Sequence, residues 1–387
     1  MKKEIDLNDK IKLYLQLLNT KFSKNDLEKL EAWRGFLAFI VILAHANQVF
    51  IAPIIGTENH INWSFGFAAH FAVLGFFVVS GIAITMSIVL NINRNNGFLN
   101  LRQYIVARIS RIYPPLILSV VLCVLFYYII HYFNFLGATQ SCKLIEDKYV
   151  AREFFTFTFG DVRDSLLFKN DALTKVNGPL WSLVIEWWIY FLIVFLVGTY
   201  FLKNKFLKLL SFIIFLLILK KLVHLNGLAY VFIWIMGSCF YIFYNIKYKY
   251  ITFILGLIGI ITCNFYFNFY NKMTDVSTLP LVQIFISVLF LSFILKFPKK
   301  SIFNKIANFS YTLYVIHFPF FLFIFFIFHD KTQNSIYVYL LEAIFSIIFI
   351  LYASYKFSIF FENKKYFSLH LDKIINFFDH KLKYNKQ

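Results

Sequence analysis

Cysteine is scarce in this chain, and its few cysteines exclude two classes of site. The four are Cys123, Cys142, Cys239 and Cys263. Only Cys142 falls in a long loop segment, so neither a disulfide framework nor a cysteine metal site is implied, and no metal is expected. The sequence also shows no cleavable signal peptide, no internal repeat and no low-complexity linker. No soluble domain is expected after the last apolar run.

Charged residues are scarce as well, at 15% of the 387 residues, whereas 60% are hydrophobic. Soluble domains are closer to half apolar, so this composition predicts a membrane protein with several spans. Lys and Arg outnumber Asp and Glu by 38 to 20, which gives a formal net charge of +18. Such an excess can indicate a nucleic-acid partner, but here the cations follow the loops between apolar runs. We therefore expect contact with a lipid bilayer and none with nucleic acid.

Apolar runs long enough to cross a bilayer as helices recur along the chain, and there are about ten of them. The predicted fold class is therefore an all-α polytopic membrane helix bundle. The runs cover residues 36–52, 67–90, 113–133, 181–201, 206–222, 227–244, 250–268, 279–296, 311–328 and 336–357.

The distribution of Lys and Arg predicts the orientation of these spans. The cations concentrate at the N-terminus, in alternate loops and in the C-terminal tail, so the positive-inside rule places both termini in the cytoplasm. Residues 1–30 are expected to form either a basic amphipathic segment on the inner leaflet or a poorly ordered tail. The membrane domain is expected at 31–362, with a long outer loop at about 134–178. Residues 363–387 then form a short basic cytoplasmic tail.

Arg34 and His45 are the first pair of residues that could carry chemistry. Eleven steps of about 100° bring their side chains to within ~20° of each other on one helix face. The rise between them is about 16 Å, roughly half the hydrocarbon thickness, which puts His45 near the midplane if Arg34 lies at the surface. Imidazole suits a general base, although His45 could instead be satisfied by a neighbouring helix.

Arg108 and Arg111 lie at the cytoplasmic side of the third predicted span. Their spacing places both on one helix face, and guanidinium groups match phosphate geometry. Pro114 is expected to mark the start of the membrane segment. The alternative is simple anchoring by the positive-inside rule. Together with Arg34 on the same side, the pair favours a site for an anionic, phosphate-bearing ligand.

Trp181, Ser182 and Glu186 open the fourth predicted span from the outer side. Ser182 and Glu186 are four residues apart and face the same way. A carboxylate inside the membrane costs several kcal/mol unless it is paired or protonated. Glu186 is therefore a candidate for a buried acid or for orienting a histidine. The alternative is an aromatic belt at the interface with a Glu side chain that reaches water.

Two further motifs lie within predicted spans. Ser80 and Gly81 are small and predict close approach of another backbone. In the ninth span, His317 is an intramembrane histidine followed by Pro319, which is expected to kink the helix. Tyr311 adds a polar group that needs a partner.

Taken together and in this order, the motifs resemble those of the acyltransferase 3 family of membrane acyltransferases over about residues 30–362. The family patterns, as they stand in this chain, are matched by Arg34 with His45; by Phe76, Phe77, Ser80 and Gly81; by Arg108, Arg111, Ile112 and Pro114; by Leu180 to Leu183 with Glu186; and by Ser310, Tyr311, Leu313, Tyr314, His317 and Pro319.

The chain departs from the family pattern at helix edges more than at ionisable groups. Glu31 and Ala32 stand where an Asp-Gly pair is usual, and Lys364 stands where a proline would follow Glu362 and Asn363. Many members carry a further SGNH-type hydrolase-like domain after the last span. None is expected here, so the chain would act alone or with a separate partner.

The resemblance implies an O-acetyltransferase of the inner (plasma) membrane. Such an enzyme moves acetyl from cytoplasmic acetyl-CoA, the acyl-CoA donor, to a hydroxyl of a surface glycan or lipid-linked sugar acceptor, in O-antigen, capsule or exopolysaccharide. It further implies roles for residues of the motifs: Arg34, Arg108 and Arg111 for the phosphates of CoA; His45 as general base or transient acyl carrier; Glu186 and His317 as further catalytic candidates; and Trp181, Ser182 and Tyr311 for substrate binding.

Two other functions share some of these features. A secondary transporter also uses intramembrane ionisable residues, but it is expected to show two related halves with broken helices, and the sequence has no such repeat. A polysaccharide polymerase or flippase would share the acceptor but would not need an arginine pair for phosphate on the cytoplasmic side.

Overall fold

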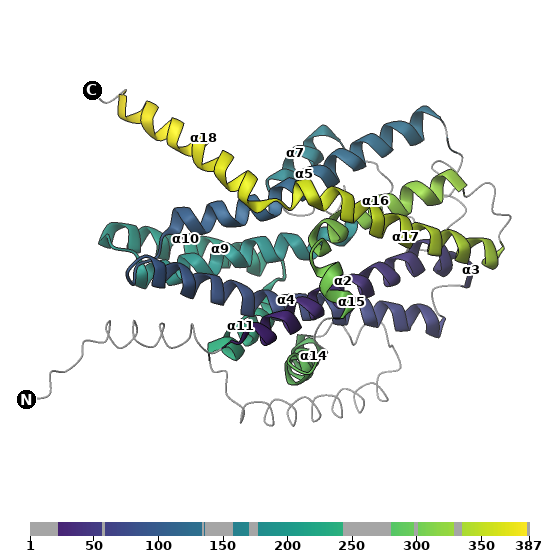
Figure 1. Ribbon diagram of the computed structural model, residues 1–387, viewed down its shortest axis with the longest axis horizontal. Coiled ribbons are helices and arrows are strands. Elements are labelled where there is room, and N and C mark those ends of the chain that lie inside the picture. The colour runs from purple at the N-terminus through teal and green to yellow at the C-terminus, as the bar shows by residue number, and fades with distance from the viewer. Residues whose placement is uncertain are drawn as a thin grey trace, which may run out of the picture. The chain divides into compact units, whose positions relative to one another are not determined.

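The structure is a computed structural model that describes residues 22–55, 59–133, 135, 158–169, 177–242, 280–297, 301–328 and 335–384 (Figure 1). Helices dominate this part of the chain and no strand occurs within it, which confirms the all-α fold class. The chain divides into two compact units. The first unit comprises Met1–Asn100 and Leu180–Asn308, and the second comprises Leu101–Pro179 and Phe309–Gln387.

The helices divide between the two units as follows. The first unit contains α2 (Lys24–Ala46), the π-helical turn η1 (Asn47–Ile51), α3 (Ala52–Ile55), α4 (His60–Arg94), α9 (Trp181–Phe201), α10 (Lys205–His224), α11 (Leu228–Ile242), α14 (Pro280–Phe293) and α15 (Ile302–Ala307). The second contains α5 (Leu101–Tyr132), α7 (Phe159–Leu166), α16 (Ser310–Phe328), α17 (Ile336–Phe361) and α18 (Lys364–Tyr384), and the 3₁₀ turn η3 (Gly178–Leu180) precedes α9.

Six of the predicted spans coincide with helices long and apolar enough to cross a membrane. The predicted runs 206–222, 227–244 and 279–296 coincide with α10, α11 and α14. Of these, α11 and α14 are shorter, and α10 carries lysines at both ends. The run 250–268 lies outside the described residues. The protein is therefore a multi-pass membrane protein, whereas the number ten and the placement of the termini stay predictions.

The first helix begins earlier than the apolar run predicts. Ser23 caps α2, because its hydroxyl accepts from the Asp26 amide at 3.2 Å while the Asp26 carboxylate accepts from the Ser23 amide at 3.1 Å. This reciprocal capping box satisfies two backbone donors that a helix start leaves open. The end of the predicted segment 1–30 is thus continuous with the first span, and residues 1–21 lie outside the described part.

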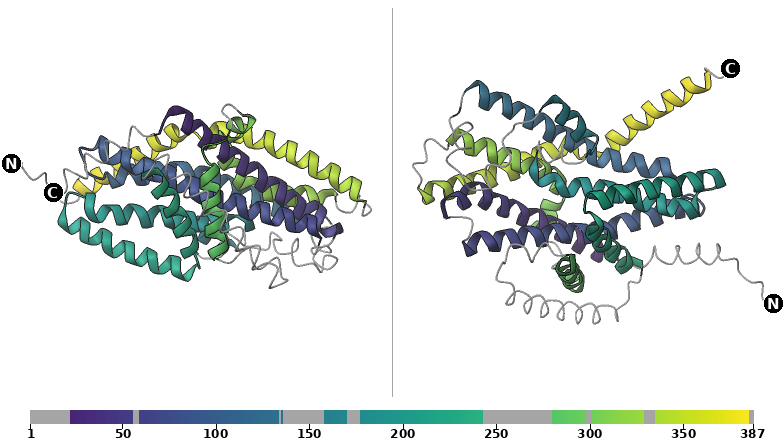
Figure 2. Two further views of the ribbon diagram at one scale, coloured as in Figure 1. Left: turned by 90° about the horizontal axis from the view of Figure 1, so that it is seen from below. Right: turned by 180° about the vertical axis from the view of Figure 1, so that it is seen from behind.

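Glycines set the helix spacing in the first unit. A Cβ on Gly81 of α4 would collide with the carbonyl of Trp234 on α11, and a Cβ on Gly237 of α11 would collide with the carbonyl of Val78 on α4. The two backbones therefore touch, which confirms the close approach predicted from the Ser80-Gly81 pair. Helices α9 and α10, drawn in teal, also lie side by side (Figures 1 and 2).

Helix α5 of the second unit contains the third predicted span and begins before it, while the point at which it enters the membrane stays a prediction. Helix α5 begins at Leu101 and includes both Pro114 and Pro115. A proline inside a helix removes one backbone donor, and such losses are tolerated in membrane helices that pack against neighbours. Here α5 packs against α16 and α17. The arginine pair consequently lies within the same continuous helix as the span, one turn before the prolines.

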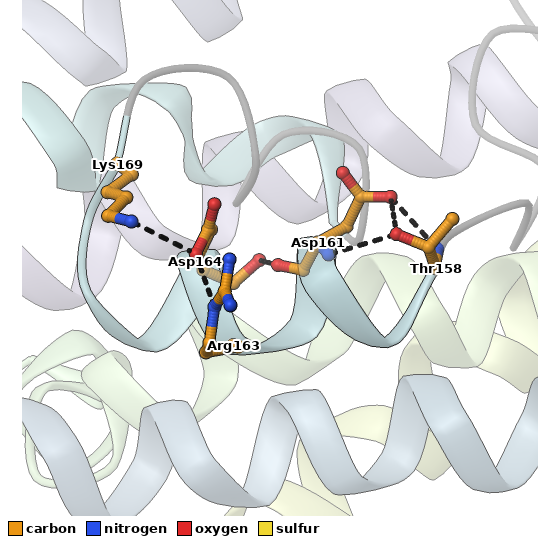
Figure 3. Close-up of polar contacts among 6 residues, drawn as sticks. Thr158, Asp161, Arg163, Asp164 and Lys169 are labelled. Atoms are coloured by element: carbon orange, nitrogen blue, oxygen red, sulfur yellow. Dashed lines mark hydrogen bonds and ion pairs between the residues drawn. The ribbon is translucent and has the colours of Figure 1, made fainter.

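Helix α7 lies in the predicted outer loop and is held by local polar contacts (Figure 3). Thr158 caps it, accepting from the Asp161 amide at 3.2 Å. At the other end, Asp164 accepts from Arg163 at 2.8 Å and from Lys169 at 3.3 Å. These exposed contacts, chiefly the hydrogen bond from Arg163, hold the pKa of Asp164 below its ordinary value of 3.8.

Helices α17 and α18 form a stretch too long for one span. From Ile336 to Phe377 there are 42 residues, or about 63 Å of helix against a hydrocarbon core of about 30 Å. The helical path breaks at Glu362 and Asn363, so α17 alone has the length of a span. Helix α18 then runs beside α5, where Arg102 donates to Asn376 at 2.6 Å and lies 3.6 Å from Asp372.

Candidate functional site

Arg34 lies in the middle of α2 and contacts the end of another helix. Its guanidinium donates to the carbonyl of Ala307, the last residue of α15, at 2.5 Å. Carbonyls at a helix C-terminus carry partial negative charge, so a cation is favourable there. The neighbouring Gly35 lets α15 approach, because a Cβ at this position would collide with the carbonyl of Phe303. Arg34 is thus held in a defined position, and one of its five donors is used to do so.

His45 lies eleven residues further along the same unbroken helix, just before the π-helical turn at Asn47–Ile51. Its Nδ1 lies 2.8 Å from the side-chain oxygen of Gln48. An amide oxygen only accepts, so with this amide orientation Nδ1 carries the proton and Nε2 carries the lone pair of the neutral imidazole. His45 therefore has the tautomer that a general base acting through Nε2 requires.

Glu186 has hydrogen-bonding partners that its sequence pattern did not identify. The Tyr190 hydroxyl, one turn later on α9, donates to the Glu186 carboxylate through a short hydrogen bond. Ser80 of α4 in turn donates to the Tyr190 hydroxyl at 3.2 Å. These two hydrogen bonds run from Ser80 through Tyr190 to Glu186, so side chains of α4 and α9 together orient the carboxylate. The signal that could have found Tyr190 is the spacing of four residues between acid and phenol.

The N-terminal end of α9 lies beside α4 and α11. The Trp181 ring packs 5.4 Å from that of Tyr230, which also lies 4.9 Å from Phe77. Ser182 is buried one turn before Glu186. Aromatic faces next to oriented polar groups are suited to contact with a sugar ring, since they offer apolar area and directional hydrogen bonds together.

The arginine pair of the second unit lies in two different environments. Arg108 is buried, with 9% of its surface exposed, and its guanidinium lies 5.5 Å above the Tyr104 ring. Arg111 is half-buried. Tyr311 of α16 donates to the carbonyl of Ile112 at 3.2 Å, so α16 is fixed to α5 one residue after the pair. A buried guanidinium stacked on a ring is a position in which a bound phosphate would be strongly stabilised.

His317 is fully buried in α16. Its Nδ1 lies 2.7 Å from the carbonyl of Tyr314 and 3.2 Å from that of Leu313. Carbonyls accept only, so Nδ1 carries the proton and Nε2 the lone pair, as in His45. The two intramembrane histidines therefore present the same nitrogen as the basic atom.

Glu362 acquires a defined contact in the second unit. Its carboxylate accepts from the backbone amide of Thr312 at 2.9 Å and from the Thr312 hydroxyl at 2.8 Å. Thr312 is the third residue of α16, so this carboxylate satisfies a donor that the helix start leaves open. Glu362 therefore caps the start of α16.

The sequence of this chain matches a known protein family. The family model for acyltransferase 3, described as an acyltransferase domain, matches residues 27–358. The chain belongs to the acyltransferase 3 family. Neither the curated proteins nor the solved structures include a significant match. The family match confirms the resemblance read from the motifs, and it establishes a membrane acyltransferase.

The acyltransferase 3 match includes every predicted site residue, and the structure brings some of them together. In the first unit, Arg34 and His45 share α2, and Trp181, Ser182 and Glu186 share the first part of α9. In the second, Tyr311 and His317 share α16, which packs against the helix that carries Arg108 and Arg111. A phosphate site that joins Arg34 to the arginine pair stays a prediction, because these residues belong to different units.

Proposed function

We propose that this acyltransferase 3 protein transfers an acetyl group from acetyl-CoA to a hydroxyl of a cell-surface polysaccharide sugar, in the inner (plasma) membrane. The observation that carries the proposal is the contact of 2.8 Å between His45 Nδ1 and the Gln48 side-chain oxygen, which favours the tautomer with the lone pair on Nε2. A neutral imidazole of this kind can remove the proton of a sugar hydroxyl. O-antigen, capsule and exopolysaccharide contain acceptors of this class.

The donor is bound through the phosphates of CoA. Arg108 and Arg111 supply the charge from α5, and Arg34 is the third cation on the cytoplasmic side. The buried position of Arg108 supports this assignment. A guanidinium held in a low-dielectric site gains more from a phosphate than an exposed one does.

The transfer step uses His45 as general base. Nε2 takes the proton of the acceptor hydroxyl as its oxygen attacks the carbonyl carbon of the thioester. The C–O ester bond forms, the C–S bond breaks, and the CoA thiolate leaves and takes the proton from the imidazolium. A path in which the acyl group rests on His45 before transfer uses the same atoms in two steps.

The acceptor is bound from the outer side by the start of α9. Trp181 provides a ring face, Ser182 a hydroxyl, and Glu186 a carboxylate oriented by Tyr190. In the second unit, Tyr311 is assigned to substrate binding and His317 to acyl transfer as a further catalytic residue. This arrangement matches what a sugar requires, which is apolar contact on its ring face and directional acceptors for its hydroxyls.

The test compares two histidines of the first unit. His45→Ala is expected to abolish acetylation of surface glycans, as seen by the loss of acetyl-group mass, while the protein still inserts in the membrane. His224→Ala is the matched control, because His224 is exposed at the end of α10 and has no proposed role. Wild-type acetylation by the His45→Ala variant would refute the assignment. Glycans that shorten instead of losing acetyl groups would indicate a polymerase.

The donor site has a separate test in purified protein. Arg111→Glu is expected to weaken acyl-CoA binding by at least about tenfold, since a phosphate contact is replaced by like-charge repulsion. Arg94→Glu is the control, because Arg94 is an exposed cation at the end of α4. Equal affinities of the two variants would remove Arg111 from the donor site.

A further inference from the structure

The carbonyl of Val315 lacks its normal helical partner. In an α-helix this oxygen would accept from the amide of residue 319, but that residue is Pro319, which has no N–H. The position is buried, with no exposed surface at Val315. A buried carbonyl left without a donor is destabilising, so the molecule must supply one from elsewhere.

Two side chains of the second unit supply it. The Ser119 hydroxyl of α5 donates to the Val315 carbonyl at 2.6 Å, and the Asn177 amide donates to the same oxygen at 2.8 Å. The Asn177 amide also lies 3.0 Å from the Ser119 hydroxyl, which closes a triangle. Both side chains are almost completely buried. This oxygen of α16, which faces the missing N–H of Pro319, is therefore bound both by α5 and by Asn177.

A second contact joins the same segment to α16 one residue earlier. The Tyr314 hydroxyl donates to the carbonyl of Pro179 at 2.7 Å. The Tyr314 carbonyl is also the closest acceptor of His317 Nδ1, at 2.7 Å. Tyr314, whose carbonyl orients the His317 imidazole and whose hydroxyl binds Pro179, is thus adjacent in α16 to Val315, which binds Asn177.

We propose that Asn177 and Ser119 are positioning residues for His317: by holding the Val315 carbonyl, which Pro319 leaves without a helical donor, they fix the direction in which Nε2 points. The inference rests on the proposed role of His317 in acyl transfer. Asn177 lies near the end of the predicted outer loop, directly before η3. Neither residue touches the reacting atoms in this assignment, and both act through the backbone of α16.

The decisive experiment exploits the missing N–H of Pro319. Pro319→Ala restores an amide that can donate to the Val315 carbonyl, which removes the need for Asn177 and Ser119. In the wild-type background, Asn177→Ala and Ser119→Ala are each expected to lower kcat about tenfold, equivalent to 1.36 kcal/mol, with the KM values of donor and acceptor unchanged. In the Pro319→Ala background the same substitutions are expected to change kcat less than about twofold.

Ser165→Ala is the matched control. Ser165 is also a fully buried serine that donates to a carbonyl, that of Asp161 at 2.6 Å, but both it and its acceptor belong to α7. The kcat of the Ser165→Ala variant is expected to equal that of its parent protein in both backgrounds. An Asn177→Ala variant with unchanged kcat, or one with the same loss in both backgrounds, would overturn the proposal.

The melting temperatures of the same variants provide an independent test of the shared Val315 carbonyl. If Pro319→Ala abolishes transfer, or the wild-type protein transfers no acetyl group, the thermal cycle is measured instead. Loss of the Asn177 effect on melting temperature in the Pro319→Ala background supports the shared carbonyl, and additive effects overturn it. Failure of the proposed function appears differently, as an inactive wild-type protein. If Asn177→Ala does not fold, Ser119→Ala carries the same cycle.

Discussion

Gly81→Ala tests how tightly the first unit is packed around Glu186. The added Cβ would fall on the carbonyl of Trp234 and within 3.2 Å of the amide nitrogen of Ser238. Both atoms are backbone of α11 and cannot rotate away, so α4 and α11 must separate. Ser80, the residue before Gly81, would move with α4 and weaken its hydrogen bond to Tyr190.

The expected change in the free energy of unfolding is the sum of one stabilising and two destabilising contributions. Replacing Gly by Ala in a helix stabilises it by about 0.5–1 kcal/mol, whereas overpacking of a tight interface costs about 1–3 kcal/mol. Loss of the hydrogen bond from Ser80 to Tyr190, at 3.2 Å in the native protein, adds about 0.5–1.5 kcal/mol. The net expectation is a destabilisation of about 0.5–4 kcal/mol.

The assay is thermal unfolding of the purified protein in detergent, with Gly66→Ala as the control. Gly66 lies in the same helix α4, and a Cβ there would meet nothing within 4 Å. The melting temperature of Gly81→Ala is expected to fall by several °C, at about 2–4 °C per kcal/mol, while that of Gly66→Ala stays level or rises. Equal melting temperatures for the two variants would show that α4 and α11 do not touch through their backbones.

Two further predictions concern the second unit. Glu362→Ala removes the carboxylate that caps Thr312 and is expected to lower the stability of α16 by about 1–2 kcal/mol. Glu362→Gln keeps an acceptor and is expected to lose less stability. The melting temperatures of the two variants and of the wild type test this order. The depressed pKa of Asp164 means that its contacts with Arg163 are present above pH ~4 and are lost as the pH falls through the folded-state pKa below 3.8. The protection of the α7 amides, measured as exchange relative to the intrinsic rate at each pH, should therefore fall in acid, and Asp164→Asn should reduce this dependence.

The sequence was sufficient to predict features that lie within one helix. Arg34 and His45 lie on α2 as the period of 3.6 residues requires, and Gly81 marks a backbone contact because no other residue leaves the space. These features depend on local spacing or on the size of a single side chain, so they are visible in one sequence.

The partners of the polar groups were not visible in the same way. Tyr190 looks like one more aromatic residue of an apolar helix, yet it orients Glu186. Pro114 and Pro115 lie inside α5, although the usual effect of proline is to end a helix, and α5 packs against its neighbours there. Such outcomes depend on which helices become neighbours, and no spacing within one segment encodes that.

The two intramembrane histidines differ in what fixes their direction. Each directs Nδ1 to an oxygen of its own helix, which leaves Nε2 as the basic atom. The acceptor of His45 is the side chain of Gln48, which can turn about its own torsions without movement of α2. The acceptor of His317 is the backbone carbonyl of Tyr314, which moves only with α16.

That difference assigns different tasks to the two groups. In the proposed transfer, a base that follows the sugar hydroxyl needs freedom to adjust, and the side-chain contact of His45 with Gln48 allows it. A group that must stay aligned needs its direction set by the backbone, and in the proposed assignment Ser119 and Asn177 give His317 this alignment by binding the Val315 carbonyl of α16. Substitutions that act on the α16 backbone should therefore impair His317 while the proton transfer at His45 is preserved.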